Sequence, residues 1–437
     1  MPRPLILGQL ALLASAIAAH GPGYVQFELE RRTLAAQSPE VVRRDSEPKA
    51  WDLDMMNRHL GYFTDIGVGT PPQWLSVHID TGSSDTWLPS VSACKNQRRK
   101  EKCLGNAFRP NQSTTVKNPK SSQGLFLMKY LDGTTSKGDY IKDTVHIAGA
   151  VIKDQRLGLG HSTSLPYGVL GLGYHHLVAL WYKMGMTYDN LPLLMWKQGL
   201  VNTVAYSMWL GKIGSAKGSL MFGAIDGSKF IGKLKRIPIL RDKIRKQYIY
   251  FTVDLTSVTV VSPTDVLRIN REDDPIKVFL DSGSTVSYLP QDVSERIWNE
   301  VGVVYFRKYN APMIECENTN STGGIRFKLG SGEGQLITVP MSELVLLPGL
   351  VPKAEDLVGE AGEWRGRNLC QFGIRNSSAN ANILGDSFLR SAYVVYDLVN
   401  HEVGIAQARM EATEPAEVIP FPTYGARIPE LERGLDD

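Results

Sequence analysis

The chain has 437 residues, with 48 lysines and arginines against 45 aspartates and glutamates. This length is too great for one ordinary hydrophobic core and suits two lobes. The near balance of charge gives no electrostatic support for a nucleic-acid partner.

The first residues have the pattern of an export signal. Arg3 supplies a positive charge, residues 5–18 form an apolar stretch, and Ala16-Ile17-Ala18 is a small-residue cleavage site. The apolar stretch is short and rich in alanine, unlike a membrane-spanning helix. We therefore predict a signal peptide over residues 1–19.

A short charged segment follows, and its basic pairs predict proteolytic processing. Arg31-Arg32 and Arg43-Arg44 are sequences that kexin-like processing proteases cut in an exposed, disordered stretch. We predict a propeptide over residues 20–44 and a processing protease that acts at Arg43-Arg44, because the globular pattern starts only a few residues later. The alternative is an ordinary solvated run of charges.

The globular region carries one short motif twice. The sequence IDTGSS occupies residues 79–84, and LDSGST occupies residues 280–285. A strand that ends in Asp and turns through a hydroxyl residue and Gly exposes the carboxylate, and Gly lets another backbone approach. Two such loops facing each other would bring Asp80 and Asp281 within about 3 Å, so the carboxyls would share one proton. A water between them could attack an amide.

The alternative for each Asp is a simple turn cap, which is the common role of Asp-x-Gly sequences. A turn cap gives no reason for the surroundings of the motif to repeat, and they do. The sequence VLG at residues 169–171 follows the first motif, and ILG at residues 383–385 follows the second.

With these motifs, the chain resembles the pepsin-like aspartic endopeptidases over residues 62–397, and its pattern is closest to fungal secreted proteases of the candidapepsin and yapsin type. The resemblance implies a mainly β, bilobal fold of two six-stranded β lobes with an active-site cleft between them. The N-terminal lobe would cover residues 45–210, with the first catalytic Asp and a flap. The C-terminal lobe would cover residues 211–407, with the second catalytic Asp.

Local composition agrees with this fold class. Short runs rich in Val, Ile, Tyr and Thr, punctuated by Gly and Pro, are typical of a mostly β chain. The clearest helical stretches are residues 191–200 and 292–301, and we expect both to be surface helices.

The resemblance also implies the site residues. Asp80 and Asp281 would be catalytic, and the supporting residues would be Ser83, Ser284, Gly82, Gly283 and Trp87. Residues 128–140 predict a hairpin, which in the family is the flap that closes over bound peptide. Its Tyr130 would hydrogen-bond Trp87. The flap residues that contact substrate would be Tyr130, Asp132, Gly133 and Thr134.

One departure from the family concerns the flap. The family commonly has Gly directly after the flap Tyr, whereas this chain has Leu131, which lacks the freedom of Gly for positive φ. Asp132 would attract a basic substrate side chain, but the basic loop over residues 95–102 would repel one if it lines the cleft. We expect cleavage next to basic or large hydrophobic residues.

Export also bears on the cysteines and sequons. Four cysteines allow three pairings, and sequence proximity together with the family pattern favours Cys94 with Cys103 and Cys316 with Cys370. Glycan acceptors are expected at Asn111, Asn320 and Asn376. No cysteine spacing suggests zinc, and we expect neither a metal nor a cofactor.

Residues 408–437 form a tail rich in Pro and Glu without aliphatic periodicity, which predicts a disordered or loosely docked segment. The tail lacks the apolar sequence that directs a lipid anchor. We therefore expect a monomeric, secreted zymogen without a membrane anchor, with cell-wall association or vacuolar residence as alternatives.

The expected activity is hydrolysis of proteins and peptides, bound in extended conformation, at acid pH, with inhibition by pepstatin-type compounds. The rival from another class is a catalytically dead homologue that binds peptide or glycan in the same cleft. Its usual mark is loss of one Asp, and both are present.

Overall fold

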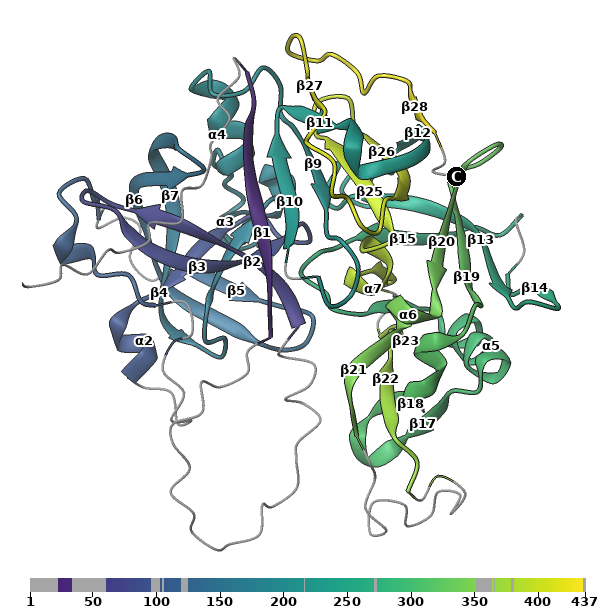
Figure 1. The fold of residues 1–437 in the computed structure, drawn as a ribbon. Coiled ribbons are helices and arrows are strands. Elements are labelled where there is room, and N and C mark those ends of the chain that lie inside the picture. Colours follow the sequence, from purple (N-terminus) through teal and green to yellow (C-terminus); the bar gives the residue numbers. More distant parts are fainter. Residues whose placement is uncertain are drawn as a thin grey trace, which may run out of the picture.

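A computed structural model describes residues 23–33, 60–95, 103, 106–118, 125–215, 217–270, 273–350, 364, 366–378 and 381–434. The fold is mostly β with few helices, as predicted, and it has two lobes with long strands between them (Figure 1). The predicted signal peptide and the Arg43-Arg44 pair lie outside the described residues.

The largest sheet has fourteen strands and contains strands from both halves of the chain. Its order is β28 (Leu431–Arg433), β12 (Phe230–Pro238), β26 (Glu402–Ala408), β25 (Ala392–Asp397), β9 (Ala205–Trp209), β10 (Lys217–Phe222), β1 (Val25–Thr33), β2 (Leu60–Val68), β3 (Gln73–Asp80), β8 (Gly168–Gly171), β4 (Thr86–Pro89), β7 (Ala150–Thr163), β6 (Thr135–Ile147) and β5 (Phe126–Lys129). An additional pairing of β2 with β6 curls the N-terminal lobe's part of the sheet onto itself.

The C-terminal lobe adds a sheet of eight strands. They are β20 (Gln335–Pro340), β19 (Gly324–Leu329), β13 (Thr252–Val261), β15 (Ile276–Leu280), β24 (Ile383–Leu384), β16 (Ser287–Leu289) and β23 (Ile374–Asn376), with β14 (Val266–Arg268) paired to β13. A four-stranded sheet holds β17 (Val304–Phe306), β18 (Ala311–Glu315), β22 (Leu369–Phe372) and β21 (Val345–Leu350).

The helices are short and lie at the ends of strands. They are α2 (Val91–Lys95), α3 (Ala179–Met184), α4 (Leu191–Lys197), α5 (Gln291–Val301), α6 (Met341–Leu344) and α7 (Asp386–Leu389). The two predicted surface helices correspond to α4 and α5. Helix α5 buries Val293 and Ile297 on one face, since residues four apart share a side, and it ends at Gly302 in the left-handed region.

The predicted propeptide contains strand β1, so the expectation of a disordered segment was wrong for Arg31-Arg32. Strand β1 lies in the middle of the large sheet, between β10 and β2. The physical reason is the alternation of apolar and polar residues in VQFELE, residues 25–30, which is a strand pattern. Val25 and Leu29 are buried.

The C-terminal tail is docked, and the expectation of a disordered or loosely docked segment was wrong. Strand β27 (Val418–Pro420) pairs with β11 (Ala224–Asp226), and β28 pairs with β12. Between them, Phe421 and Ile428 are buried in a cluster beneath the tail. Two isolated apolar anchors carry no helical or strand periodicity, which is why the pattern of the sequence did not reveal them.

Replacing Phe421 with alanine is expected to destabilise the protein by about 3–5 kcal/mol, because a fully buried aromatic side chain would leave a cavity. The measurement is the urea midpoint at unchanged m-value. The control is Thr423→Ala, an exposed position on the same tail, expected to change stability by less than about 0.5 kcal/mol. Equal midpoints for the two variants would contradict a docked tail.

A buried ion pair joins three segments of the chain, namely α6, the residue after α7 and the loop that contains Ile213. The side chains of Glu343 in α6 and Arg390, just after α7, are 2% and 1% exposed. Arg390 Nε donates to Glu343 Oε2 at 2.5 Å, and the backbone N–H of Ile213 donates to both carboxylate oxygens at 2.8 and 3.0 Å. A charge this deeply buried is tolerated only with such partners.

Candidate active site

The two repeated motifs form matching loops at the ends of strands. Asp80 is the last residue of β3, and Asp281 directly follows β15. Asp80 Oδ1 accepts a hydrogen bond from the N–H of Gly82 at 2.8 Å, and its Oδ2 accepts one from Ser83 Oγ at 2.5 Å. Each loop therefore holds its own carboxylate by one backbone and one hydroxyl donor, since the second loop repeats this pattern.

In the second loop, the N–H of Gly283 donates to Asp281 Oδ1 at 2.8 Å, and Ser284 Oγ donates to Asp281 Oδ2 at 2.9 Å. Both aspartates are almost fully buried, at 5% and 7% exposed. The sequence repeat is thus a structural repeat, in which equivalent atoms make equivalent bonds.

The glycines allow the two loops to meet. A Cβ atom added at Gly82 would lie 2.5 Å from Asp281 Oδ1, and one added at Gly283 would lie 2.5 Å from Asp80 Oδ1. Such distances are shorter than any van der Waals contact, so each carboxylate rests against the glycine of the opposite loop. The structure therefore brings Asp80 and Asp281 together, as the paired motifs predict.

Thr81 and Ser282 cross-link the loops, a role that the sequence analysis did not assign. Each side-chain hydroxyl accepts from the backbone N–H of the other residue, at 3.0 and 3.2 Å. Each hydroxyl also donates across to a carbonyl that precedes the opposite aspartate, at 3.1 Å. The signal was available, because both copies of the motif have a hydroxyl residue directly after Asp.

The two aliphatic-Gly segments run behind the loops. Strand β8 pairs in parallel with β3, with Gly171 opposite Asp80, and it also pairs with β4 after the loop. In the second half, β24 likewise pairs in parallel with β15, before the Asp loop, and antiparallel with β16, after it. A Cβ at Gly171 would lie 2.6 Å from the backbone of Ser84, so only glycine fits where these segments pass behind the loop.

The electrostatics of the pair follow from burial and proximity. Burial raises the pKa of both carboxyl groups, and for Asp80 the neighbouring Asp281 carboxylate raises the pKa further. The Ser and Gly hydrogen bonds oppose this rise by favouring the ionised form. Two carboxyls in direct contact titrate as one system, and this pair retains a proton at pH values where a solvated aspartate has lost it.

The dyad is expected to make the folded chain less stable as pH rises above the ordinary Asp pKa of 3.8. The folded state holds a proton that the unfolded chain releases, so the free energy of unfolding falls with increasing pH. An Asp80→Asn variant keeps a neutral group at this position. Its urea midpoint should therefore exceed that of the wild type by an increasing margin from pH 4 to pH 7.

The control for this measurement is Asp154→Asn, on the exposed surface of β7. Lys117 lowers the pKa of Asp154 through a hydrogen bond. The pKa shift of Asp154 has the opposite sign, because the folded state favours its ionised form. The Asp154→Asn variant should therefore gain no stability over the wild type at pH 7. Parallel midpoint curves for the wild type and Asp80→Asn would contradict the raised pKa of the dyad.

The predicted flap is a hairpin of β5 and β6. Its turn is closed by the N–H of Tyr130, which donates to the carbonyl of Thr134 at 2.9 Å, and by Gly133 at φ +83°. Trp87 Nε1 donates to the Tyr130 hydroxyl at 2.7 Å. The expected Tyr130–Trp87 contact is present, and it ties the flap to the strand that follows the first Asp loop.

Leu131 does not strain the flap. Leu131 does not have a positive φ, because the residue with positive φ in this turn is Gly133. The Leu131 side chain is 71% exposed. Asp132 folds back on the turn, since its Oδ1 accepts from the N–H and the hydroxyl of Thr134 at 2.8 and 2.7 Å. Most of the basic loop, over residues 96–102, lies outside the described residues.

A buried carboxylate behind Trp87 was also missed by the sequence analysis. Asp85 accepts hydrogen bonds from the hydroxyls of Tyr140 and Tyr188 at 2.6 and 2.7 Å, and from the N–H of Ala179 at 2.6 Å. Burial raises the pKa of Asp85, and these donors lower it. This cluster fixes β6 and the start of α3 against the strand that carries Trp87.

The expected disulfides and glycan acceptors can also be compared with the structure. The structure contains both expected disulfides, Cys94–Cys103 and Cys316–Cys370. Asn111 and Asn320 are exposed. Asn376 is half-buried, and its Oδ1 accepts a hydrogen bond from Ser294. Among the described residues, no helix is long and apolar enough to span a membrane.

Matching loops, strands threaded behind them and a hairpin flap define the bilobal pepsin-like fold. The profile described as eukaryotic aspartyl protease matches residues 61–408, and the chain belongs to this family of aspartic-type endopeptidases. The chain is 34% identical over 397 residues to the "Probable aspartic-type endopeptidase OPSB" of Arthroderma benhamiae, an alignment that covers 90% of this chain and 78% of the relative.

Two further relatives come from yeasts. An "Acid protease" of Saccharomycopsis fibuligera is 34% identical over 396 residues, covering 90% of this chain and 88% of that protein. "Candidapepsin-3" of Candida albicans is 30% identical over 416 residues, covering 92% of this chain and 94% of that protein. The expected resemblance to fungal proteases of this type is confirmed.

Proposed function

We propose that Asp80 and Asp281 are the catalytic dyad of a secreted zymogen whose mature form hydrolyses internal peptide bonds of proteins at acid pH. The observation that carries this proposal is the reciprocal contact, in which each carboxylate rests on the glycine of the other loop. Only such a pair combines an ionised and a neutral carboxyl within reach of one water molecule.

The proposed reaction uses the dyad as base and acid. The ionised carboxylate takes a proton from water while the oxygen of that water attacks the scissile carbonyl carbon. The protonated carboxyl gives its proton to the carbonyl oxygen. The carboxyl that took the proton from water then gives it to the leaving nitrogen, the C–N bond breaks, and the other carboxylate takes a proton from a diol hydroxyl as the carbonyl re-forms. The dyad again holds one proton, and no intermediate is covalently bound to the enzyme.

The supporting residues have separate roles in this proposal. Ser83 and Ser284 hold one oxygen of each carboxylate, and the N–H groups of Gly82 and Gly283 hold the other. Preorganised donors of this kind fix the carboxylates without reorganisation during the reaction. Tyr130, held by Trp87, would close the flap over an extended peptide.

The zymogen proposal has structural support in the position of β1. This strand precedes the family match at residue 61, yet it occupies a central place in the sheet. Cleavage at Arg43-Arg44 would separate it covalently from the catalytic lobes. Secretion is supported by the apolar N-terminal sequence and by a relative named "Secreted aspartic protease 3" from Candida albicans, and we propose glycans at the exposed Asn111 and Asn320.

The test is cleavage of an unfolded protein substrate by the secreted, processed chain between pH 3 and pH 7, with and without pepstatin. The expected result is cleavage that is fastest at acid pH, because the dyad needs one proton, and that pepstatin abolishes. Cleavage that resists pepstatin would contradict the dyad mechanism. No cleavage by a folded, processed chain would instead indicate a homologue that only binds peptide.

A further inference from the structure

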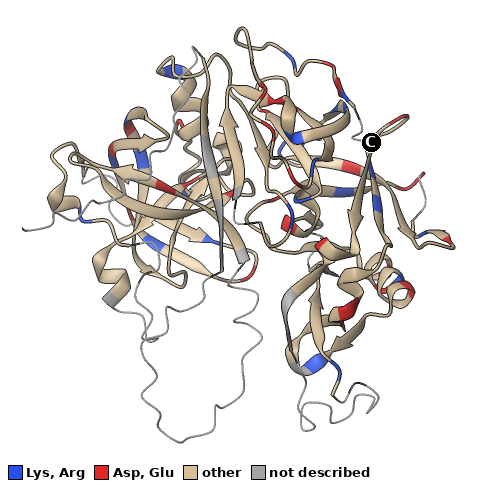
Figure 2. Cartoon of the chain, viewed as in Figure 1, with Lys and Arg blue, Asp and Glu red and all other residues tan. Residues whose placement is uncertain are grey.

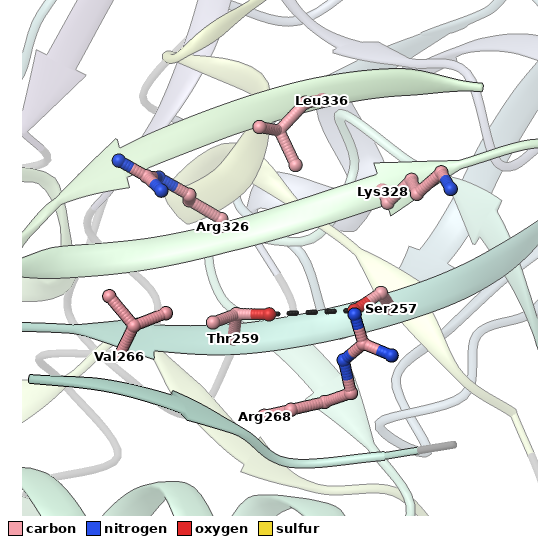
Figure 3. A pocket seen from close by; sticks show the side chains of 7 residues that line it. All are labelled: Ser257, Thr259, Val266, Arg268, Arg326, Lys328 and Leu336. Carbon is pink, nitrogen blue, oxygen red and sulfur yellow. Dashed lines mark hydrogen bonds between the residues drawn. The ribbon is translucent and has the colours of Figure 1, made fainter. Parts of the chain in front are cut away.

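The C-terminal lobe has a cavity of about 360 Å³ whose lining includes no residue of either Asp loop. Figure 3 shows its lining side chains, which come from β13, β14, β19 and β20. Three of them are cationic, namely Arg268, Arg326 and Lys328. None of the described residues that line it is acidic.

The strand register explains why these cations share one face. Thr259 of β13 lies opposite Arg268 on one side and opposite Arg326 on the other. Two residues earlier, Ser257 lies opposite Lys328, on the same face because side chains alternate along a strand. The intervening residues, such as Val258 and Phe327, are buried in the core on the other side of the sheet.

The arrangement therefore surrounds two hydroxyl groups with positive charge. Ser257 Oγ and Thr259 Oγ share a hydrogen bond of 3.4 Å between these cations (Figure 3). Elsewhere, lysines and arginines are scattered over both lobes (Figure 2). The positive charge of these side chains would attract an anion to this face of the sheet.

Arg326 supplies a second, independent observation. Its Nε is buried and has no hydrogen-bond acceptor among the described residues. A buried donor without an acceptor costs roughly 1–3 kcal/mol, and more when it is charged. A guanidinium fork and two hydroxyl donors are well suited to the oxygens of a tetrahedral anion.

We propose that this cavity binds a phosphate group, either as free phosphate or as a phosphate ester. Arg326 and Arg268 would bind its oxygens from either side, with Ser257 and Thr259 as donors at the floor. Leu336 and Val266 at the rim are 48% and 59% exposed. These two side chains would contact the carbon skeleton of a phosphate ester, whereas free phosphate would gain no such contact.

The test is calorimetric titration of the full chain with inorganic phosphate near pH 6.5, at ionic strength held constant with sodium chloride. Saturable binding is expected. Arg326→Gln should weaken it by at least about tenfold, the effect of losing one hydrogen bond to a charged group. Lys153→Gln removes one cation from an exposed position of β7 in the other lobe, and its affinity should stay within about twofold of the wild type.

A second arm uses glucose 6-phosphate as the probe. Tighter binding than inorganic phosphate identifies an ester, through the apolar rim, and weaker or equal binding identifies free phosphate. If Arg326→Gln does not fold by circular dichroism, the exposed Arg268→Gln carries the same expectation. Absence of saturable binding of both probes to the wild type, or equal affinities of the folded variant and Lys153→Gln, would overturn the proposal without affecting the peptidase.

Discussion

Replacing Asp80 with asparagine is expected to lower kcat/KM for peptide hydrolysis by at least about 10³-fold, and Asp281→Asn should do the same. Asparagine has the shape of aspartate, but its amide can neither accept the proton of water nor protonate the carbonyl oxygen. Because the two carboxyls would act as one unit in the proposed mechanism, the double variant should lose little more than either single variant. The measurement is the cleavage rate of an unfolded protein substrate at acid pH.

The matched control is Asp154→Asn, which makes the same chemical change at an exposed position, where asparagine also tolerates the observed φ of 55°. Its kcat/KM should stay within about twofold of the wild type. Pepstatin-sensitive cleavage by Asp80→Asn at more than about a tenth of the wild-type rate would refute a base and acid role for this pair.

Truncating Glu343 to alanine is expected to destabilise the protein by about 3–5 kcal/mol. The change would leave the guanidinium of Arg390 buried without its counter-charge and would remove the acceptor of the Ile213 N–H. The free energy of unfolding from urea titration at neutral pH measures the effect. At this size, it is a large share of the stability of a typical folded protein.

Two comparisons separate the buried charge from the loss of side-chain volume. The double variant Glu343→Leu/Arg390→Met should be less destabilised than the sum of its single variants, since it leaves no unpaired charge. Glu430→Ala removes one partner of the exposed Arg236–Glu430 pair, which is expected to cost at most about 1 kcal/mol. A Glu343→Ala cost as small as that of Glu430→Ala would show that the buried pair does not stabilise the fold.

The sequence repeat was sufficient to predict the centre of the site. Each Asp-x-Gly-Ser loop carries its own donors within three residues, so the local sequence determines the geometry of each carboxylate. The Trp87–Tyr130 contact and the two disulfides could be predicted for a different reason, since they rest on a family resemblance that covers most of the chain.

The remaining features depend on contacts between distant segments, which a local pattern does not contain. Asp85 looks like any polar residue in the sequence, and its role arises only when Tyr140, Tyr188 and Ala179 fold around it. Phe421 and Ile428 are single apolar residues in a Pro- and Glu-rich tail. The alternation of apolar and polar residues in β1 is a strand signal, but the same segment contains a basic pair that is also typical of a processing site.

If the chain is activated by cleavage as proposed, the place of β1 affects when activation takes place. Six residue pairs join it to β10 and four join it to β2, so a cut at Arg43-Arg44 would break one covalent bond and leave the strand in its sheet. The cleaved peptide should then copurify with the enzyme, and its departure would expose two unpaired strand edges that another strand must cover. Proteolysis and the release of the peptide would be two separate events, and the interval between them would be set by the dissociation of a β-strand rather than by the protease that makes the cut.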